Sequence, residues 1–539
     1  VTSSETWTWL HRPVFRATPL DMKTVADGYF LQGSNQLIGH GWPYTAEGVD
    51  YPGWRFYASA VFDEKNPWWI VMPDVAGYLQ RTSHLLRQGT PANDVALYLA
   101  NDDAWAQFTP GHVAMNAIVA SDLGPEIVRG ILDSGHNFDA FDDELLALRG
   151  KLDGGRLGFG DLRYRAVVLA GVERMPLATL RTLDAFARAG GILIATRRLP
   201  SVVPGYLATA AEQEELHAIV HRLFVAPDAP GLFLPDEEGF GEALNRRLPP
   251  DVAFAAAEPD VGVVHRHTAD AEIYFLANTG GAAVHAEASF RVAGRQPEWW
   301  DLMNGEVEAA PVAGRTADAT TVRVDLPAFG SRALVFTSRH LPAPAESTST
   351  AAPPAPLDLS TGWTVAFGPG AQPVPLERLE SWTAEAATRN FSGVATYRKS
   401  VTVPAALLRP GLRVALNFGE ARPPEGAGAG RRGRRAGAAA ADSEPAGPPA
   451  AGGGRGGRGG RGGRGGGAGG SVENYEAPVR EAAVVYVNGV RAGSVWHPPY
   501  EIDVTSLLHA GPNDLRVDVA NLALNEMAAH PPPDYTALT

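Results

Sequence analysis

Residues 18–44 read TPLDMKTVADGYFLQGSNQLIGHGWPY and carry the clearest structural signal in the chain. Thr18-Pro19 is a typical helix start, apolar residues then recur at helical spacing, and Gly33 is a stop signal. Asn35–Gly39 has the pattern of a short strand, and it is followed directly by His40-Gly41-Trp42-Pro43-Tyr44. The stretch therefore predicts a helix, a strand and then two aromatic residues and a histidine just past the end of the strand.

The residues around this stretch extend the pattern to a barrel. Residues 3–7, Ser-Ser-Glu-Thr-Trp, have the appearance of the end of an earlier strand. Strand, helix and strand form the repeating unit of a parallel (β/α)8 barrel, in which functional residues lie beyond the C-terminal ends of the strands. Helical spacing of apolar residues over 68–90 predicts a helix that packs against the outside of the barrel. We therefore predict that residues 1–92 are the C-terminal remnant of a (β/α)8 catalytic barrel.

Strands and helices continue to alternate over residues 93–245. The expected strands are Val95–Leu99, Ala166–Ala170 and Ile192–Ala195, and the expected helical stretches are Val113–Ser134 and Leu177–Ala189. This alternation predicts an open parallel sheet, in a flavodoxin-like α/β domain. The switch point of such a sheet can hold a ligand. However, no glycine-rich phosphate loop follows any of the strands, so we do not expect a nucleotide site.

Two all-β parts follow. Residues 246–340 are dominated by strand-like runs and predict a small β-sandwich. Residues 341–356 are rich in Pro, Ala, Ser and Thr and predict a linker. Residues 357–539 predict a second β-domain, in which Asn488-Gly489 forms a hairpin turn.

The second β-domain is interrupted at residues 421–471, which are Gly, Ala, Pro and Arg with almost no apolar content. Such a segment cannot bury enough surface to fold, so we expect a long disordered hairpin loop. We expect Leu416–Phe418 and Val484–Tyr486 to pair as neighbouring strands on its two sides. The Arg-Gly-Gly units of the insertion are similar to RNA-binding tracts. Because no folded RNA-reading motif accompanies them, we prefer a solvated loop. The arginines of these units are Arg455, Arg458, Arg461 and Arg464.

Composition narrows the classes of function. The net charge of −14 over 539 residues argues against a nucleic-acid groove and suits a neutral substrate such as a sugar. No run approaches the roughly 20 apolar residues of a membrane span, so we expect no membrane partner. The absence of Cys removes disulfides, thiol nucleophiles and thiolate metal sites. The chain begins at Val1 with no Met and no signal-like region, so we expect a truncated or processed start.

Glu5 is the first candidate for catalysis. It is flanked by Trp7 and Trp9. Glycoside cleavage needs two carboxyl groups across the bond, and aromatic faces stack on sugar rings. The alternative interpretation is a surface glutamate near a frayed end.

His40, Trp42 and Tyr44 form the second candidate cluster. Their side chains offer hydrogen bonds and a stacking platform at the end of a strand. A structural role, with both aromatic residues in the core, is the alternative.

Other polar motifs favour structural interpretations. Glu298–Asp301 is expected in a turn of the β-sandwich, and His497–Tyr500 is expected in an edge-strand turn, although the latter could bind sugar. Three further acids are expected to be helix and turn residues, namely Asp21, Asp27 and Asp50.

Together these residues resemble glycoside hydrolase family 106, the α-L-rhamnosidases. The resemblance rests first on Ser3–Trp7 and Gln36–Tyr44, which are its more specific motifs. It continues through Pro297–Asp301 and Val487–Gly489 to Asn521–Asn525, in the same order of domains. The part after the linker is similar to the galactose-binding-like jelly roll that many β-galactosidase-like enzymes share.

The resemblance implies a calcium-assisted hydrolysis of terminal α-L-rhamnosides with inversion, by two acidic residues in a (β/α)8 barrel. It implies that Glu5 is the base that activates water, with His40, Trp42 and Trp7 as substrate contacts. The general acid and the calcium ligands are expected upstream of Val1, so the chain alone is expected to be inactive. A periplasmic or secreted location is expected from the same resemblance.

Two alternatives stay open at this point. A β-galactosidase-like glycosidase would share the accessory domains but prefer galactosides. A non-catalytic carbohydrate-binding protein would keep affinity for glycans without turning them over.

Overall fold

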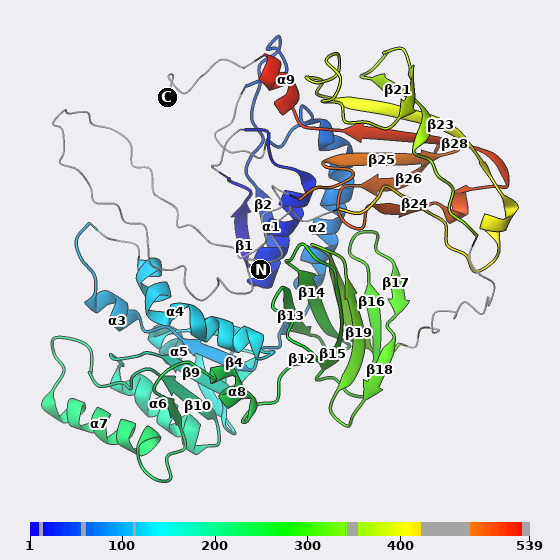
Figure 1. The fold of residues 1–539 in the computed structure, drawn as a ribbon. Helices are drawn as coiled ribbons and strands as arrows, with labels where there is room; N and C mark the ends of the chain where they lie inside the picture. The colour runs from blue at the N-terminus through cyan, green and yellow to red at the C-terminus, as the bar shows by residue number, and fades with distance from the viewer. Residues whose placement is uncertain are drawn as a thin grey trace, which may run out of the picture.

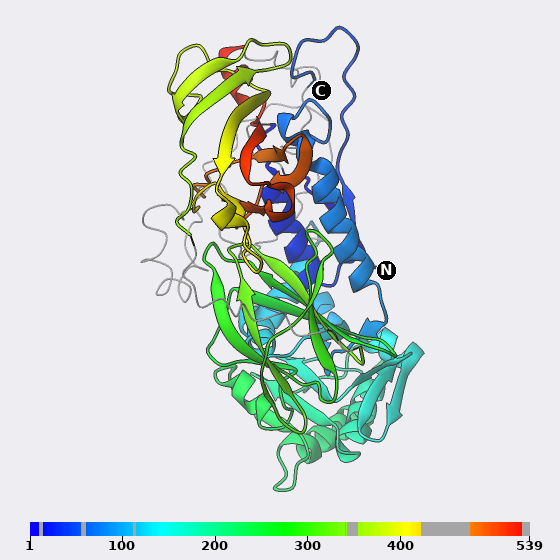
Figure 2. The same ribbon diagram turned by 90° about the vertical axis from the view of Figure 1, so that its right-hand side faces the viewer.

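The computed structural model describes residues 1–9, 14–54, 61–111, 115–339, 341, 354–421 and 475–530. Most of the predicted linker and of the predicted insertion lie outside these residues. The fold is mixed α/β with several separate sheets. Figure 1 shows the α/β part at one end, an antiparallel part in the middle and a second antiparallel part at the other end, and Figure 2 shows the same order from the side. Among the described residues, no helix has the length and apolar content that crossing a membrane would require.

The N-terminal part is a strand–helix–strand unit followed by a helix. Its elements are β1 Ser3–Thr6, α1 Pro19–Leu31, β2 Gln36–Gly39, the short helix η1 Pro67–Val71 and α2 Met72–Leu86. The predicted helix and strand of residues 18–39 are confirmed. Thr18 caps α1 through its side chain, and Asp21 returns a hydrogen bond to the Thr18 backbone. β1 and β2 are parallel and form a two-stranded sheet, with no further strand beside them among the described residues.

The next part confirms the predicted open parallel sheet. Its strand order is β11-β10-β9-β4-β5 and every pair is parallel, which is the 2-1-3-4-5 order of doubly wound sheets. The strands are β4 Val95–Tyr98, β5 Phe138–Phe141, β9 Ala166–Ala170, β10 Ile192–Thr196 and β11 Leu232–Leu234. The helices are α3 Asn101–Ala106, α4 Met115–Asp133, α5 Asp143–Arg149, α6 Leu177–Arg188, α7 Ala210–Phe224 and α8 Phe240–Asn245. Along the chain, a small antiparallel sheet comes after β5 and before β9. Its strands are β6 Gly150–Asp153, β7 Arg156–Phe159 and β8 Leu162–Tyr164.

Alternate residues of the parallel strands build two cores on opposite faces of this sheet. Val167 and Leu169 of β9 pack with α6 and α7, whereas Val168 packs with α4 and α8. A strand buried on both faces must be apolar throughout, which explains the Ala-Val-Val-Leu-Ala run of β9.

Two antiparallel sheets form the middle part, as predicted for a sandwich. One has the order β12-β15-β19-β18 and the other β17-β16-β20-β14-β13-β3. Their side chains share a single apolar core, which includes Phe290 and Val322 from the first sheet and Leu276 and Phe336 from the second. The strands are β3 Thr90–Pro91, β12 Val252–Phe254, β13 Val261–His267, β14 Glu272–Asn278, β15 Val284–Phe290, β16 Gln296–Trp300, β17 Val307–Ala309, β18 Val312–Arg315, β19 Thr320–Leu326 and β20 Ser331–Thr337.

The C-terminal part is a six-stranded antiparallel sheet, β22-β21-β23-β28-β25-β26, accompanied by the pair β24-β27. Its strands are β21 Thr361–Phe367, β22 Val374–Arg378, β23 Val394–Val403, β24 Ala415–Asn417, β25 Ala482–Val487, β26 Val490–Val495, β27 Glu501–Asp503 and β28 Gly511–Ala520. Two short helical segments, η2 Ala405–Leu408 and η4 Thr505–Leu507, and the helix α9 Leu524–Ala529 complete this part. The Asn488-Gly489 turn is confirmed, since both residues have positive φ and join Val487 to Val490.

The predicted pairing on either side of the insertion is wrong. β24 pairs with β27, and β25 pairs with β26 and β28. A strand has only two edges. β26, which a tight hairpin joins to β25, and the long strand β28 occupy both edges of β25. The apolar pattern of Leu416–Phe418 identified a strand but could not identify its partner.

One hydrophobic core joins the N-terminal unit to both antiparallel parts. It combines Phe30 of α1, Val75 of α2, Phe275 of β14 and Val484 of β25. Both views show α1 and α2 beside the place where the sandwich and the C-terminal sheet approach each other. The N-terminal unit is therefore held in place from two sides.

A buried charge network lies where the sandwich meets the parallel sheet. His265 is 7% exposed, and its ring nitrogens lie 2.8 Å from Asp251 Oδ2 and 3.0 Å from Glu272 Oε2. Its ring stacks on Tyr274 at 3.9 Å between centroids. Burial by itself would lower the pKa of His265, but the two carboxylates outweigh burial and raise the pKa to about 9.

We expect this histidine to make stability depend on pH in the alkaline range. A pKa raised above the unfolded value of about 6.5 gives stabilisation that is complete below that value and is lost as pH rises through about 9. The urea midpoint should therefore fall between pH 7 and pH 10. His265→Gln should have a lower midpoint at pH 7 and a flatter pH dependence. The matched control is His285→Gln, because His285 pairs with Asp325 on the surface. An unchanged pH dependence in His265→Gln would contradict the assignment.

Candidate active site

The βαβ unit brings Glu5 and His40 to the same edge. In the parallel register Glu5 lies opposite Ile38 and Thr6 lies opposite Gly39. The His40 backbone N–H then donates to the Thr6 carbonyl at 3.1 Å and continues the ladder by one residue. Because both strands run in the same direction, their C-terminal ends meet, and the residues that follow them are neighbours (Figure 1).

Three side chains form a hydrogen-bonded cluster at this edge. Glu5 Oε1 lies 3.0 Å from His40 Nδ1. Thr8 Oγ1 donates to Glu5 Oε1 at 2.9 Å and lies 3.2 Å from His40 Nδ1. The Glu5 side chain is 65% exposed and that of His40 34% exposed. The carboxylate is thus oriented by two neighbours while it stays open to an incoming molecule, which is the arrangement that a general base needs.

Thr8 was not singled out from the sequence. It stands three residues after Glu5 in a Trp-Thr-Trp run, and a loop has no periodicity that would assign its side chain to a partner. Only the turn after β1, where Trp7 has a φ of 69°, brings the Thr8 hydroxyl back to the carboxylate.

Trp7 does not lie at the surface of the cluster. Its side chain is 5% exposed, packs against Phe62 at 5.4 Å between centroids, and donates its indole N–H to the Met22 carbonyl at 3.0 Å. This burial does not fit the substrate contact expected for Trp7. Trp7 instead anchors the end of β1 to α1, because the turn directs its ring into the core.

Trp42 and Tyr44 lie in the open. Trp42 is 66% exposed and meets Trp69 edge to face at 5.5 Å, and Tyr44 is 74% exposed and meets Trp54 at 5.6 Å. The alternative of two core aromatic residues is therefore wrong. Both rings follow β2 on the same stretch of chain as His40, so the neighbourhood of Glu5 offers aromatic faces to a ligand.

The remaining acids and histidines have structural roles. Asp21 caps α1, the Asp50 carbonyl accepts the Gly53 N–H in a turn, and Glu298 is buried on β16, where Arg339 pairs with it. His497 lies after β26, and burial lowers its pKa to about 4. Neither Glu298 nor His497 offers an open site.

The described residues do not supply a metal site. In this part of the chain no group of three or more acidic or histidine side chains gathers around a point that could hold an ion. The described residues therefore do not fit the calcium that the resemblance implies.

Comparison with known proteins identifies the family. Residues 1–313 match the family model of the glycoside hydrolase 106 α-L-rhamnosidases. The structure of a rhamnosidase from Novosphingobium sp. PP1Y is similar over 99% of this chain and 44% of that one, with a TM-score of 0.69 and 24% identity, so the two share a fold. A protein of Formosa agariphila named "Putative beta-glucuronidase" is 24% identical over 315 residues, which are 56% of this chain and 24% of that protein. The chain thus spans less than half the length of either relative. Because the family model covers more than half of the 539 residues, the chain belongs to glycoside hydrolase family 106, the α-L-rhamnosidase family.

Proposed function

We propose that this chain carries the catalytic base of an α-L-rhamnosidase that hydrolyses terminal α-L-rhamnosides with inversion. The observation that carries the proposal is the Glu5 carboxylate, held by His40 and Thr8 at the C-terminal ends of two parallel strands. In a (β/α)8 barrel, catalytic groups stand at this end of the strands.

Glu5 takes a proton from water as the water attacks the anomeric carbon of the sugar. Thr8 donates to Glu5 Oε1, and His40 Nδ1 lies 3.0 Å from the same oxygen, so both neighbours hold the orientation of the carboxylate. Trp42 offers its exposed face to the apolar side of the sugar ring. Inversion requires a second carboxyl group that protonates the leaving oxygen. It stands roughly 6.5–9.5 Å from the carboxyl group of the base, a distance that leaves room for the water.

In this proposal the second carboxyl group comes from a part of the barrel outside residues 1–539, as the family resemblance implies. Within the described residues, the side chain of Glu5 contacts Thr8 and His40, and no other carboxyl group is among its partners. The proposal therefore assigns turnover to the protein in its full natural length and not to residues 1–539 alone. The general acid and the calcium ligands belong to other parts of the barrel.

The proposal includes a division of the chain into domains. Parallel sheets are normally covered on both faces and wider than two strands, whereas most residues of β1 and β2 are exposed or half-buried. Such a unit fits the end of a barrel in residues 1–92. A flavodoxin-like domain occupies 93–245, a β-sandwich 246–340, a linker 341–356, and a galactose-binding-like jelly roll 357–539. The protein is periplasmic or secreted and binds carbohydrate, without a nucleic-acid or membrane partner.

The test is a panel of aryl glycosides assayed with the protein in its full natural length. We expect hydrolysis of the α-L-rhamnoside, with β-L-rhamnose as the first product seen by NMR. Preference for a galactoside or a glucuronide would contradict the proposed substrate. α-L-Rhamnose as the first product would contradict inversion. Sugar binding without turnover would favour a non-catalytic binding protein. Turnover by residues 1–539 alone would contradict the external general acid.

A further inference from the structure

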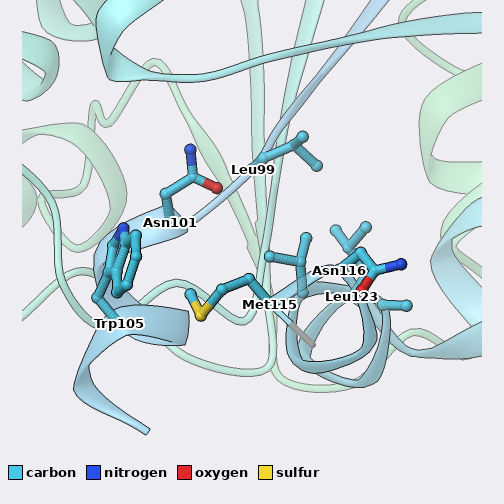
Figure 3. Close-up of a pocket in the computed structure, with 8 residues that line it drawn as sticks. Leu99, Asn101, Trp105, Met115, Asn116 and Leu123 are labelled. Carbon is cyan, nitrogen blue, oxygen red and sulfur yellow. The ribbon is translucent and has the colours of Figure 1, made fainter. Parts of the chain in front are cut away.

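A concave surface lies at the C-terminal edge of the parallel sheet, on elements separate from the Glu5 cluster. Figure 3 shows it between the end of β4, α3 and the first half of α4, with Leu99, Trp105, Met115 and Leu123 around it. It is an open hollow of about 440 Å³. β4 is the strand at which the order of this sheet reverses, and ligands of doubly wound sheets bind beyond the strand ends at that point.

The lining has the chemistry of a site for a neutral, partly apolar ring. Trp105 is 60% exposed, which is a large apolar surface for a tryptophan to leave open. Asn101 and Asn116 add amide groups, and none of the side chains that line the hollow is charged. An aromatic face together with amide donors and acceptors suits a sugar, which has C–H groups on one face and hydroxyls around its rim.

The side that carries Trp105 is held rigidly. Asp103, on the same helix, is 1% exposed and accepts the backbone N–H groups of Glu173 and Arg174 at 2.8 and 2.9 Å. These bonds fasten α3 to the loop after β9. The Asn101 amide donates to Asp142 at 3.0 Å, so its orientation is fixed too. Because this helix is held in place, the backbone that carries Trp105 loses little freedom when a ligand binds.

The opposite side is fixed independently. α4 is interrupted at Gly124, whose φ and ψ of 70° and 166° are not helical. Arg197, on the loop after β10, donates to the Leu123 carbonyl at 3.2 Å, just before this interruption. Gln107 after α3 donates to Asp122 of α4 at 2.8 Å and bridges the two sides. The hollow is therefore a built feature between two fixed walls.

We propose that this hollow binds one neutral sugar ring of a glycan, stacked on Trp105 and hydrogen-bonded by Asn101, at a site distinct from the catalytic cluster. A phosphate ligand does not fit, because the lining lacks a cation and no glycine-rich loop follows β4. The hollow would bind a branch or a neighbouring sugar of the glycan while Glu5 acts on a different sugar of the same glycan. Binding to the hollow does not require turnover.

The experiment is a titration of the 539-residue chain labelled with 5-fluorotryptophan, using methyl α-L-rhamnopyranoside and methyl β-D-galactopyranoside as probes. The ¹⁹F signal of Trp105 is assigned by its loss in Trp105→Phe. We expect a saturable shift of this signal at millimolar concentrations of at least one probe. Ala120→Trp, which fills the hollow from α4, should weaken that binding at least about fivefold, since a stacked ring contributes about 1 kcal/mol and the filled space admits no ring.

Two controls separate this site from the rest of the surface. Trp42→Ala should leave the Trp105 shift unchanged, which excludes transmission from the Glu5 cluster. Tyr206→Ala removes an aromatic ring that is 102% exposed outside the hollow and should also change nothing. Absence of a shift with both probes, or full binding in Ala120→Trp, would overturn the proposal. A change of native mass in Trp105→Ala would instead make this face a protein interface and would equally overturn it.

Discussion

Glu5→Gln is expected to lower kcat for an aryl α-L-rhamnoside by about 10²- to 10⁴-fold in the full-length protein, because general-base catalysis contributes about that much. Gln keeps the size of Glu5 and can still accept the Thr8 hydroxyl hydrogen, which lies 2.9 Å from the carboxylate in the wild type. It cannot take a proton from water at neutral pH. KM should change little, so a fall in kcat with an unchanged KM is the informative result.

Chemical rescue distinguishes a lost base from a disturbed fold. In Glu5→Ala, azide can enter the space left by the side chain and attack without a base, so turnover should recover and yield the β-glycosyl azide. Glu64→Gln is the matched control, since Glu64 is an exposed acid of the same N-terminal part. Near-normal turnover by Glu5→Gln would remove Glu5 from the mechanism. A slow Glu5→Ala that azide does not accelerate would leave it a structural residue.

His40 and Thr8 act on this reaction through Glu5, so their loss should have smaller effects. Thr8→Val keeps the shape of the side chain and removes one hydrogen bond to the carboxylate. A hydrogen bond to a charged group contributes about 1.5–3 kcal/mol, which corresponds to roughly ten- to hundredfold in rate if it is fully expressed in the transition state. The acid limb of the pH–rate profile, which follows the base, should move to higher pH in Thr8→Val, because the lost hydrogen bond stabilised the charged carboxylate. A purely structural role would lower the rate without moving this limb.

The sequence predicts local structure well where a single element decides it. The helix start at Thr18-Pro19 and the strand Ala166–Ala170 both appear as expected, because capping and the apolar run act over a few residues. The proximity of Glu5 and His40 also follows from the predicted strand–helix–strand unit, since the ends of parallel strands lie side by side. In contrast, the partner of Leu416–Phe418 depended on β27, which lies far along the chain.

The errors at the candidate site have a common cause. Trp7 and Trp42 are both aromatic residues near a strand end, yet one is buried and the other exposed. Their environments differ because the chain turns sharply at Trp7, and a positive φ at a tryptophan has no sequence signature. Identification of an aromatic run therefore predicts a surface rich in rings without predicting which ring a ligand can reach.

The second large effect is expected at a buried ion pair that fixes the N-terminal unit. Lys23 is 1% exposed and Asp27 3% exposed, with Nζ and Oδ2 2.7 Å apart. Lys23 also donates to the Phe329 carbonyl at 2.7 Å and to Ser331 Oγ at 3.0 Å, so all three ammonium hydrogens have acceptors. Tyr78 of α2 donates to the other oxygen of Asp27. The pair thereby connects α1, α2 and the sandwich.

Lys23→Met should lower the free energy of unfolding by about 3–5 kcal/mol, since removal of one partner leaves a buried charge uncompensated. Burial already raises the pKa of Asp27, and Lys23 opposes that rise. Without Lys23 the pKa should rise further, so protonation of Asp27 on folding becomes favourable and the loss should shrink as pH falls from 7 to 5. Asp27→Asn in the Lys23→Met background should recover part of the stability at pH 7 for the same reason.

Urea unfolding of the single and double variants measures both effects, with Lys151→Met on an exposed strand as the control. Equal stability of Lys23→Met and the wild type would mean that the apolar core around α1 and α2 holds this unit without the ion pair, and a loss independent of pH would point to packing around the Lys23 stem as its cause.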